Sequence, residues 1–271
     1  MGPTRIRCKI AFSIFALGAL CPPVWAQETA ADATLAPFTL SAKYEVDWSG
    51  IPIGRINITA SEGATGYRMV VDTKTSGIAQ LFSDERTEAS VEGIGGLGTP
   101  YLPRRYASAP QKNGKGQRTT ITYDEAGKIL SLERLPGDDP NWRPVVPRDQ
   151  ANTATDPITA AFALRRRLHE ALATGQTSAA VRTYDGARLA TMRATIVQPR
   201  TLTVMDQPMA VVDTRITRTP ITGYTPKEIK KFEKGDPEIH LYFTRDAEML
   251  PVKITVESGF GPVHARMIKR N

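Results

Sequence analysis

Histidine is the side chain most often used for acid–base catalysis and metal binding, and this sequence contains three: His169, His240 and His264. No two of them stand three or four residues apart, so no helical turn places a pair on one face. Glu170 follows His169, but the second histidine of a zinc-protease helix is missing. The Gly-x-Ser-x-Gly turn of serine hydrolases is missing as well. The sequence therefore predicts no catalytic residue, no metal site and no cofactor.

Adjacent carboxylates are the other candidates for acid–base chemistry. Asp84 and Glu85 form one pair and Asp138 and Asp139 form another, but acids at turns usually face solvent. Gly93 to Gly98 has the glycine spacing of a dinucleotide-binding loop. That loop works only when a helix begins directly after it, and the proline-containing stretch that follows here cannot be that helix. We interpret these glycines as a flexible turn.

One edge of a predicted helix offers a binding site instead. Phe162, Arg165 and His169 follow each other at intervals of three and four residues, so they lie along one edge of that helix. In one interpretation, Arg165 and His169 rest their stems on the core edge and place their polar ends in water. In the other, all three border the opening of a pocket, with Phe162 beneath. We take these three as the predicted ligand-binding residues.

The helix that positions them is Asp156 to Gly175, the only convincing long helix in the sequence. Thr155 or Asp156 can cap its start, Pro157 fits the first helical position, and Gly175 suits the left-handed residue at its end. At about 100° per residue, the expected core face consists of Ile158, Ala160, Ala161, Leu164, Leu168, Ala171 and Leu172. The opposite face would carry Thr159, Arg166, Arg167 and Glu170. Such an apolar face needs a sheet to cover it.

Outside this helix the hydrophobic period is two, which predicts β-strands. About a dozen or more strands are expected, separated by turns such as Ser49-Gly50 and Asp185-Gly186. An open sheet of that size exposes its edges, and curling removes most of them. We predict a mainly β fold: a curled antiparallel sheet, barrel-like or an unclosed β-spiral, with one central helix at about residues 156–174. Pro136 to Thr155 and Thr222 to Pro237 are expected to be connecting loops.

The first 26 residues are predicted to be a secretion signal peptide. A basic start precedes a short apolar stretch. The residues Val24-Trp25-Ala26 suit the positions before a cleavage site, so we expect cleavage after Ala26. Cys21 permits a lipid-anchored alternative, but Leu20 stands where a small residue is preferred. The apolar stretch is too short to span a bilayer, so no transmembrane segment is expected in the mature chain. Residues 27–38 are predicted to be a flexible lead-in, and 39–271 a single β-rich domain.

Removal of the signal peptide changes the charge and the redox chemistry of the chain. It takes away three basic residues and no acids, which leaves +4 of the formal net charge of +7. It also takes away both cysteines, so the mature chain has no disulfide and no thiolate metal site. The remaining charges are mixed along the strands, which disfavours a nucleic-acid groove.

Several short motifs, in order, resemble a bacterial exported family catalogued as domain of unknown function 3108. They are the stretch from Tyr44 to Gly54, Asp156-Pro157, Tyr184-Asp185-Gly186, and Asp246 with Leu250-Pro251-Val252. The resemblance implies export and a β-rich fold, and it supplies no active site. The chain is also similar in design to envelope-integrity proteins of alphaproteobacteria that form a spiralled β-sheet around a helix.

These observations predict a periplasmic, non-catalytic protein that supports the integrity of the cell envelope. It would bury an apolar group of a lipid-like or peptide ligand in the curled sheet, near Phe162, Arg165 and His169, or bind a protein partner. The alternative is a periplasmic hydrolase acting on envelope material, with carboxylates or His240 brought together by folding. A third hypothesis is a structural subunit of a larger envelope complex.

Overall fold

The computed structural model describes residues 35–271 except 82, 138–141, 236 and 258–260. The predicted signal peptide, most of the predicted lead-in and the pair Asp138–Asp139 lie outside the described residues. Among those described, no helix is both long and apolar enough to cross a membrane.

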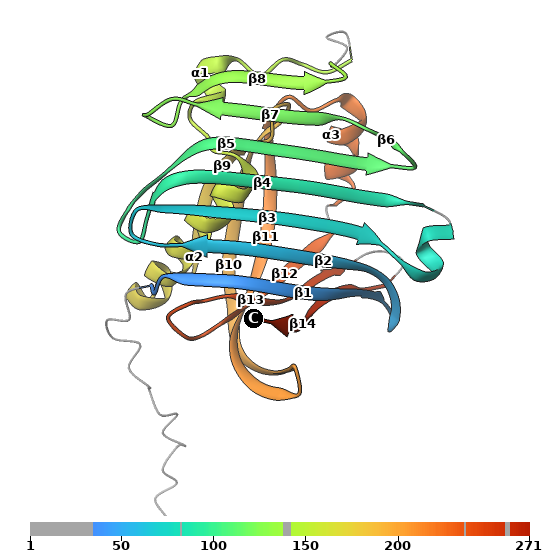
Figure 1. The fold of residues 1–271 in the computed structure, drawn as a ribbon, viewed down its shortest axis with the longest axis vertical. Helices are drawn as coiled ribbons and strands as arrows, with labels where there is room; N and C mark the ends of the chain where they lie inside the picture. The colour runs from blue at the N-terminus through green and yellow to red at the C-terminus, as the bar shows by residue number, and fades with distance from the viewer. Residues whose placement is uncertain (1–34, 82, 138–141, 236, 258–260) are drawn as a thin grey trace, which may run out of the picture. The chain divides into compact units, whose positions relative to one another are not determined.

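The described chain is mainly strand, in agreement with the predicted fold class (Figure 1). The first half contains β1 Phe38–Trp48, β2 Ile51–Glu62, β3 Gly66–Thr75, β4 Glu85–Gly96, β5 Thr99–Lys112, β6 Lys115–Gly116, β7 Arg118–Tyr123 and β8 Ile129–Leu135. The second half contains β9 Ser178–Tyr184, β10 Leu189–Val204, β11 Gln207–Thr222, β12 Glu238–Thr244, β13 Pro251–Glu257 and β14 Val263–Arg270. The helical segments are η1 Gly77–Leu81, α1 Arg148–Ala151, α2 Pro157–Thr174 and α3 Pro226–Glu233.

All of these strands belong to one antiparallel sheet. Its order is β8-β7-β5-β4-β3-β2-β1-β14-β13-β12-β11-β10-β9, and β6 pairs with β5 off this path. The first and last strands therefore meet in the middle of the sheet, where β1 pairs with both β2 and β14. In the described part of the chain, the outer strands β8 and β9 do not pair with each other, so the curled sheet is not closed into a barrel.

A short stretch of chain crosses the opening between β8 and β9. The Asn152 side chain accepts a hydrogen bond from the backbone N–H of Ile129 on β8, at 2.9 Å. Three residues later, the Thr155 carbonyl accepts from the N–H of Tyr184 on β9, at 2.8 Å, and the Thr155 N–H donates to the carbonyl of Arg182. This seam segment, residues 152–155, satisfies backbone groups on both sheet edges and leads directly into α2.

The long helix α2 lies against β4, β5, β9 and β10, behind the first-half strands in the view of Figure 1. Asp156 caps it, and one carboxylate oxygen of this residue accepts from the N–H groups of Ile158 and Thr159, at 3.0 and 2.8 Å. Gly175 ends the helix with φ 71°, as predicted from the preference of glycine for this conformation. The predicted start, end and central position of the helix are confirmed.

The buried face of α2 differs from the predicted apolar arc, and three assignments were wrong. Ala161, expected in the core, is exposed. Thr159, expected on the outer side, is buried, and its hydroxyl shares a hydrogen bond of 2.9 Å with the hydroxyl of Tyr67. Leu172, expected in the core, is 36% exposed at the last turn. The difference arises because the sheet curls around α2 near its start, where polar side chains find partners, and leaves the last turn uncovered.

The interior around α2 is rich in aromatic rings. Phe162 packs with ring-centroid distances of 5.0 Å to Tyr67, 6.0 Å to Tyr101 and 6.3 Å to Phe38. Because these partners come from β1, β3 and β5, the single ring of Phe162 joins the helix to three strands of the first half. A second cluster on the other side of the helix contains Leu164 and Leu168 and the inner face of β9–β12.

A buried ion pair also fastens α2 to the sheet. The Arg165 guanidinium donates to the Glu62 carboxylate at 2.6 Å, and the two side chains are 5% and 0% exposed. Arg165 also donates to the Glu248 carbonyl in the turn between β12 and β13. The Tyr101 hydroxyl donates to the other oxygen of the same Glu62 carboxylate, at 2.5 Å. Both charges are therefore compensated inside the protein.

The helix α3 was not expected, because Thr222 to Pro237 was predicted to be a loop. Its start carries a capping box: the Thr225 hydroxyl accepts from the Glu228 N–H, and the Glu228 carboxylate accepts from the Thr225 N–H. Pro226 occupies the first helical position. The sequence signal for this helix was present in Thr225-Pro226-Lys227-Glu228.

Replacement of Arg165 tests the buried ion pair. Arg165→Met leaves the Glu62 charge in the interior, so we expect the free energy of unfolding to fall by about 3–5 kcal/mol in urea denaturation. The double variant Glu62→Gln/Arg165→Met removes both charges and should be more stable than Arg165→Met alone. The matched control is Arg86→Met, which breaks only exposed pairs and should cost less than about 1 kcal/mol. Equal losses in Arg165→Met and Arg86→Met would contradict the role of the pair.

The cap of α2 gives a pH-dependent prediction. Complete burial raises the pKa of Asp156 from 3.8 to about 6, although the helix N–H groups lower it in part. Because the folded protein holds this proton more tightly, the contribution to stability is full below about pH 3.8 and is lost as the pH rises through about 6. Asp156→Asn keeps the cap and removes the titration.

We therefore expect Asp156→Asn to gain roughly 2–3 kcal/mol relative to the wild type between pH 4 and pH 7, measured by urea denaturation across that range. Asp156→Ala serves as the control, because it removes the cap as well and should be destabilised at every pH by about 1 kcal/mol relative to Asp156→Asn. A pH-independent difference between Asp156→Asn and the wild type would show that the buried carboxyl does not titrate in this range.

Candidate functional site

The candidate site is a cavity of about 860 Å³ beside α3, which we call the α3 cavity. Its walls come from β9 to β13 and from α3 itself. The floor contains Met192, Ile216 and Ile239, which also pack on the hydrophobic cluster that covers α2. The cavity therefore continues from the core of the second half of the sheet to its surface.

One side of the α3 cavity opens along β11, where this strand loses a neighbour. β11 pairs with β12 only from Val211 to Ile216, so the next residues of β11 have α3 beside them in place of a strand. Phe232 of α3 packs edge-on against Tyr224, with ring centroids 5.3 Å apart. The guanidinium of Arg218 lies over the same Phe232 ring at 4.8 Å. These aromatic contacts place α3 as the outer wall of the cavity.

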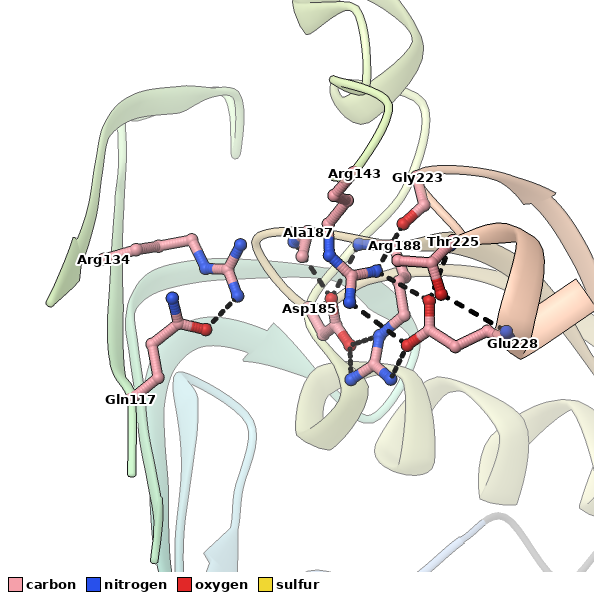
Figure 2. A network of polar contacts seen from close by, with 9 residues as sticks. All are labelled: Gln117, Arg134, Arg143, Asp185, Ala187, Arg188, Gly223, Thr225 and Glu228. Atoms are coloured by element: carbon pink, nitrogen blue, oxygen red, sulfur yellow. Dashed lines mark hydrogen bonds and ion pairs between the residues drawn. The ribbon is translucent and has the colours of Figure 1, made fainter. Parts of the chain in front are cut away.

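A polar network holds α3 in that position (Figure 2). Arg143 makes a two-pronged ion pair with Glu228, with nitrogen–oxygen distances of 2.9 and 3.1 Å, and donates to the Gly223 carbonyl at 2.6 Å. Burial opposes ionisation of Glu228, but the bonds from Arg143 and from the Thr225 N–H outweigh it and hold the pKa of Glu228 below its usual value. The helix is thus tied to the connection that precedes α2.

The turn between β9 and β10 supplies the other side of this network. One Asp185 carboxylate oxygen accepts from the N–H groups of Ala187 and Arg188, at 3.0 and 2.8 Å. Its second oxygen accepts from the Arg188 side chain at 2.8 Å, and this guanidinium reaches Glu228 at 3.3 Å. Burial lowers the pKa of Arg188, but the carboxylates of Asp185 and Glu228 raise it by more, so the net shift is upward. Figure 2 shows Arg143 and Arg188 converging on Glu228.

The three predicted ligand-binding residues lie elsewhere, along one edge of α2. Phe162 and Arg165 are buried in contacts with the protein itself, and Arg165 keeps its charged end out of water, contrary to the first interpretation of its role. His169 is partly buried, and this burial, followed by the nearby Arg165 charge, lowers the pKa of its ring. None of the three lines the α3 cavity. Ligand contact at these residues stays a prediction.

The histidines also bear on the hydrolase hypothesis. One ring nitrogen of His240 is hydrogen-bonded to the Asp213 carboxylate at 2.6 Å, and the other lies 3.3 Å from the Glu238 carboxylate. Burial lowers the pKa of His240, but these two carboxylates outweigh it and raise the pKa. A histidine with both nitrogens engaged and its charged form favoured is a poor general base. Among the described residues, no group of three or more possible ligands could hold a metal ion.

The fold and the cavity define a class of protein: a curled antiparallel β-sheet wrapped around one helix, with a hollow beside a second helix. The chain belongs to the family of proteins of unknown function DUF3108, whose model matches residues 43–268. This confirms the family suggested by the sequence motifs. A search among curated proteins found no match.

Two solved structures are similar to this chain. One is a β-barrel-like protein of domain of unknown function DUF1849 from Brucella abortus, with 12% identity, a TM-score of 0.49 and coverage of 88% of this chain and 98% of that chain. The other is described as "a putative lipoprotein from Parabacteroides distasonis ATCC 8503", with 10% identity, a TM-score of 0.33 and coverage of 88% and 96%.

The polar network predicts how firmly α3 is held. Glu228→Gln removes the charge that Arg143 and Arg188 share and weakens the capping box. We expect hydrogen exchange of the α3 backbone amides to accelerate by about tenfold, with little change in the core strands. Glu233→Gln is the matched control, because this glutamate is exposed on the same helix. Equal acceleration in both variants would mean that the network does not hold the helix.

Proposed function

We propose that this chain is an exported, non-catalytic protein of the cell envelope that binds a lipid-like ligand in the α3 cavity. The single observation that carries this proposal is the cavity itself: about 860 Å³, with a floor of Met192, Ile216 and Ile239. Cavities for small molecules usually measure about 300–1,000 Å³ and are lined mainly by apolar side chains with a few polar groups. An acyl chain is a ligand that would fit a cavity of this volume and pack on its apolar floor.

The charges around the cavity favour a ligand with an anionic end. Asp185 pairs with Arg188, and Glu238 lies 3.6 Å from Arg215, so these four charges compensate each other in pairs. Lys231 adds a further positive charge to the lining, and the guanidinium of Arg218 lies over the Phe232 ring at 4.8 Å. A fatty acid or another acyl chain with an acidic head group would place its tail on the apolar floor and its head among these cations.

Export supports the envelope part of the proposal. The predicted signal peptide would deliver the mature chain, without cysteines, to the periplasm, and supporting envelope integrity is a role suited to a protein that holds a lipid. A peptide ligand or a protein partner is the competing occupant of the cavity. A lipid-like occupant is favoured because the cavity lies within one sheet and continues into its apolar core.

Occupancy of the cavity can be tested with Ile239→Trp. The larger side chain should fill the floor and weaken binding of hexadecanoic acid by at least about tenfold, measured by native mass spectrometry and by fluorescence displacement of a dansylated fatty acid. Lipid extracted from the purified wild-type protein should contain an acyl compound that is depleted in this variant.

Val70→Trp is the matched control, because it adds a large ring at an exposed position of β3, away from the cavity. It should bind hexadecanoic acid as the wild type does. If the wild type neither retains an acyl compound nor binds hexadecanoic acid, the proposed function is wrong. If both tryptophan variants bind as the wild type does, the ligand occupies another place.

A further inference from the structure

A second hollow lies at the unclosed seam of the sheet and shares no lining residue with the α3 cavity. Its volume is about 460 Å³, and it is bounded by α2, by β9 and β10, by the first residues of β5 and by residues 153–155 of the seam segment. We call it the arginine pocket, after Arg166 and Arg167 of α2 and Arg182 of β9. The two helical arginines are adjacent in the sequence and start in different directions around α2, and both line this hollow.

All of the charged residues that line the arginine pocket are positive. The three guanidiniums share it with threonines, alanines and an aromatic ring, and the described lining contains no carboxylate. Arg166 pairs with Glu170 at 3.7 Å, and the Glu170 side chain is 62% exposed. A pair that is so long and so exposed neutralises little of the charge. The hollow therefore holds a concentrated positive potential in a chain whose surface charges are otherwise mixed.

Each guanidinium is fixed by a neutral oxygen. Arg166 donates to the Thr99 carbonyl and lies over the Tyr101 ring at 4.7 Å. Arg167 donates to the Ala180 carbonyl on the free edge of β9, and Arg182 donates to the Thr153 hydroxyl at 2.8 Å. A guanidinium carries five N–H donors, so one bond of this kind fixes its position and leaves donors for a ligand. The groups are oriented before any ligand binds, which lowers the entropic cost of binding.

We propose that the arginine pocket binds the phosphate group of a small ligand or of a lipid head group. Guanidiniums form two parallel hydrogen bonds with a phosphate, and three of them around one hollow suit its several oxygens and its charge. A pocket of this size accommodates a phosphate with a few attached carbon atoms. This site differs in place and in ligand chemistry from the α3 cavity, so the two proposals stand independently.

Titration of the full mature chain with inorganic phosphate, followed by calorimetry and by ³¹P line broadening, tests the site directly. We expect saturable binding that weakens as salt rises, and a loss of roughly tenfold in affinity for each of Arg167→Gln and Arg182→Gln. Sedimentation with phosphatidylglycerol vesicles, compared with phosphatidylcholine vesicles, identifies the source of the phosphate. Vesicle binding that is lost in Arg182→Gln assigns a lipid head group, whereas phosphate binding without vesicle binding assigns a soluble phosphate ester.

The matched control is Arg68→Gln, an exposed arginine of β3 that does not line the arginine pocket, which should bind phosphate and vesicles as the wild type does. Because Arg167 and Arg182 are both exposed, we expect their variants to melt at the wild-type temperature. An unchanged melting temperature shows that a loss of affinity comes from the binding site and not from unfolding. The proposal is overturned if neither phosphate nor anionic vesicles bind. It is also overturned if binding falls as much in Arg68→Gln as in Arg182→Gln. Hexadecanoic acid binding should survive Arg182→Gln, which separates this test from that of the α3 cavity.

Discussion

The ion pair between Arg165 and Glu62 is the interaction on which the rest of the structure depends. Arg165 comes from α2, Glu62 ends β2 in the first half of the sheet, and the Glu248 carbonyl belongs to the second half. Burying two charges is favourable only when their remaining donors and acceptors are also satisfied, and here Tyr101, Glu248 and the Phe38 ring complete the set. The helix therefore has one position in which all of these partners are met, and that position fixes the spacing between the two halves of the sheet.

Placing a helix inside the curl has a geometric consequence. The edges β8 and β9 stay apart in the described structure, and the seam segment bonds to both of them. Space remains on two sides of α2: the arginine pocket opens along the seam, and the α3 cavity continues from the cluster under Leu164 and Leu168. The charged residues that line the arginine pocket are all positive, whereas the α3 cavity combines an apolar floor with charges of both signs.

Much of the fold was readable from the sequence because alternation and turn chemistry are local signals. Strands such as Glu238–Thr244 alternate clearly, and Asp156-Pro157 with Gly175 marks both ends of α2. The partner of Arg165 was not readable, since hydrophobic periodicity does not say which distant acid a buried arginine will meet. The sequence analysis missed α3 because its lysines suggested a solvated loop, although Thr225 and Glu228 have the spacing of a capping box. The hollows depend on how the strands separate, which no local pattern encodes.

The pairing of β1 with β14 has a consequence for how the chain is made. The first strand of the chain pairs with the last one, and more than two hundred residues lie between Trp48 and Val263. Until β14 is in place, β1 and β13 each present an unsatisfied edge in the middle of what will become a continuous sheet. Each half can pair its own strands, but the two halves join only when the last strand of the chain pairs with the first. Before that pairing, both edges are open to association with another chain, so this late step is the one most exposed to aggregation.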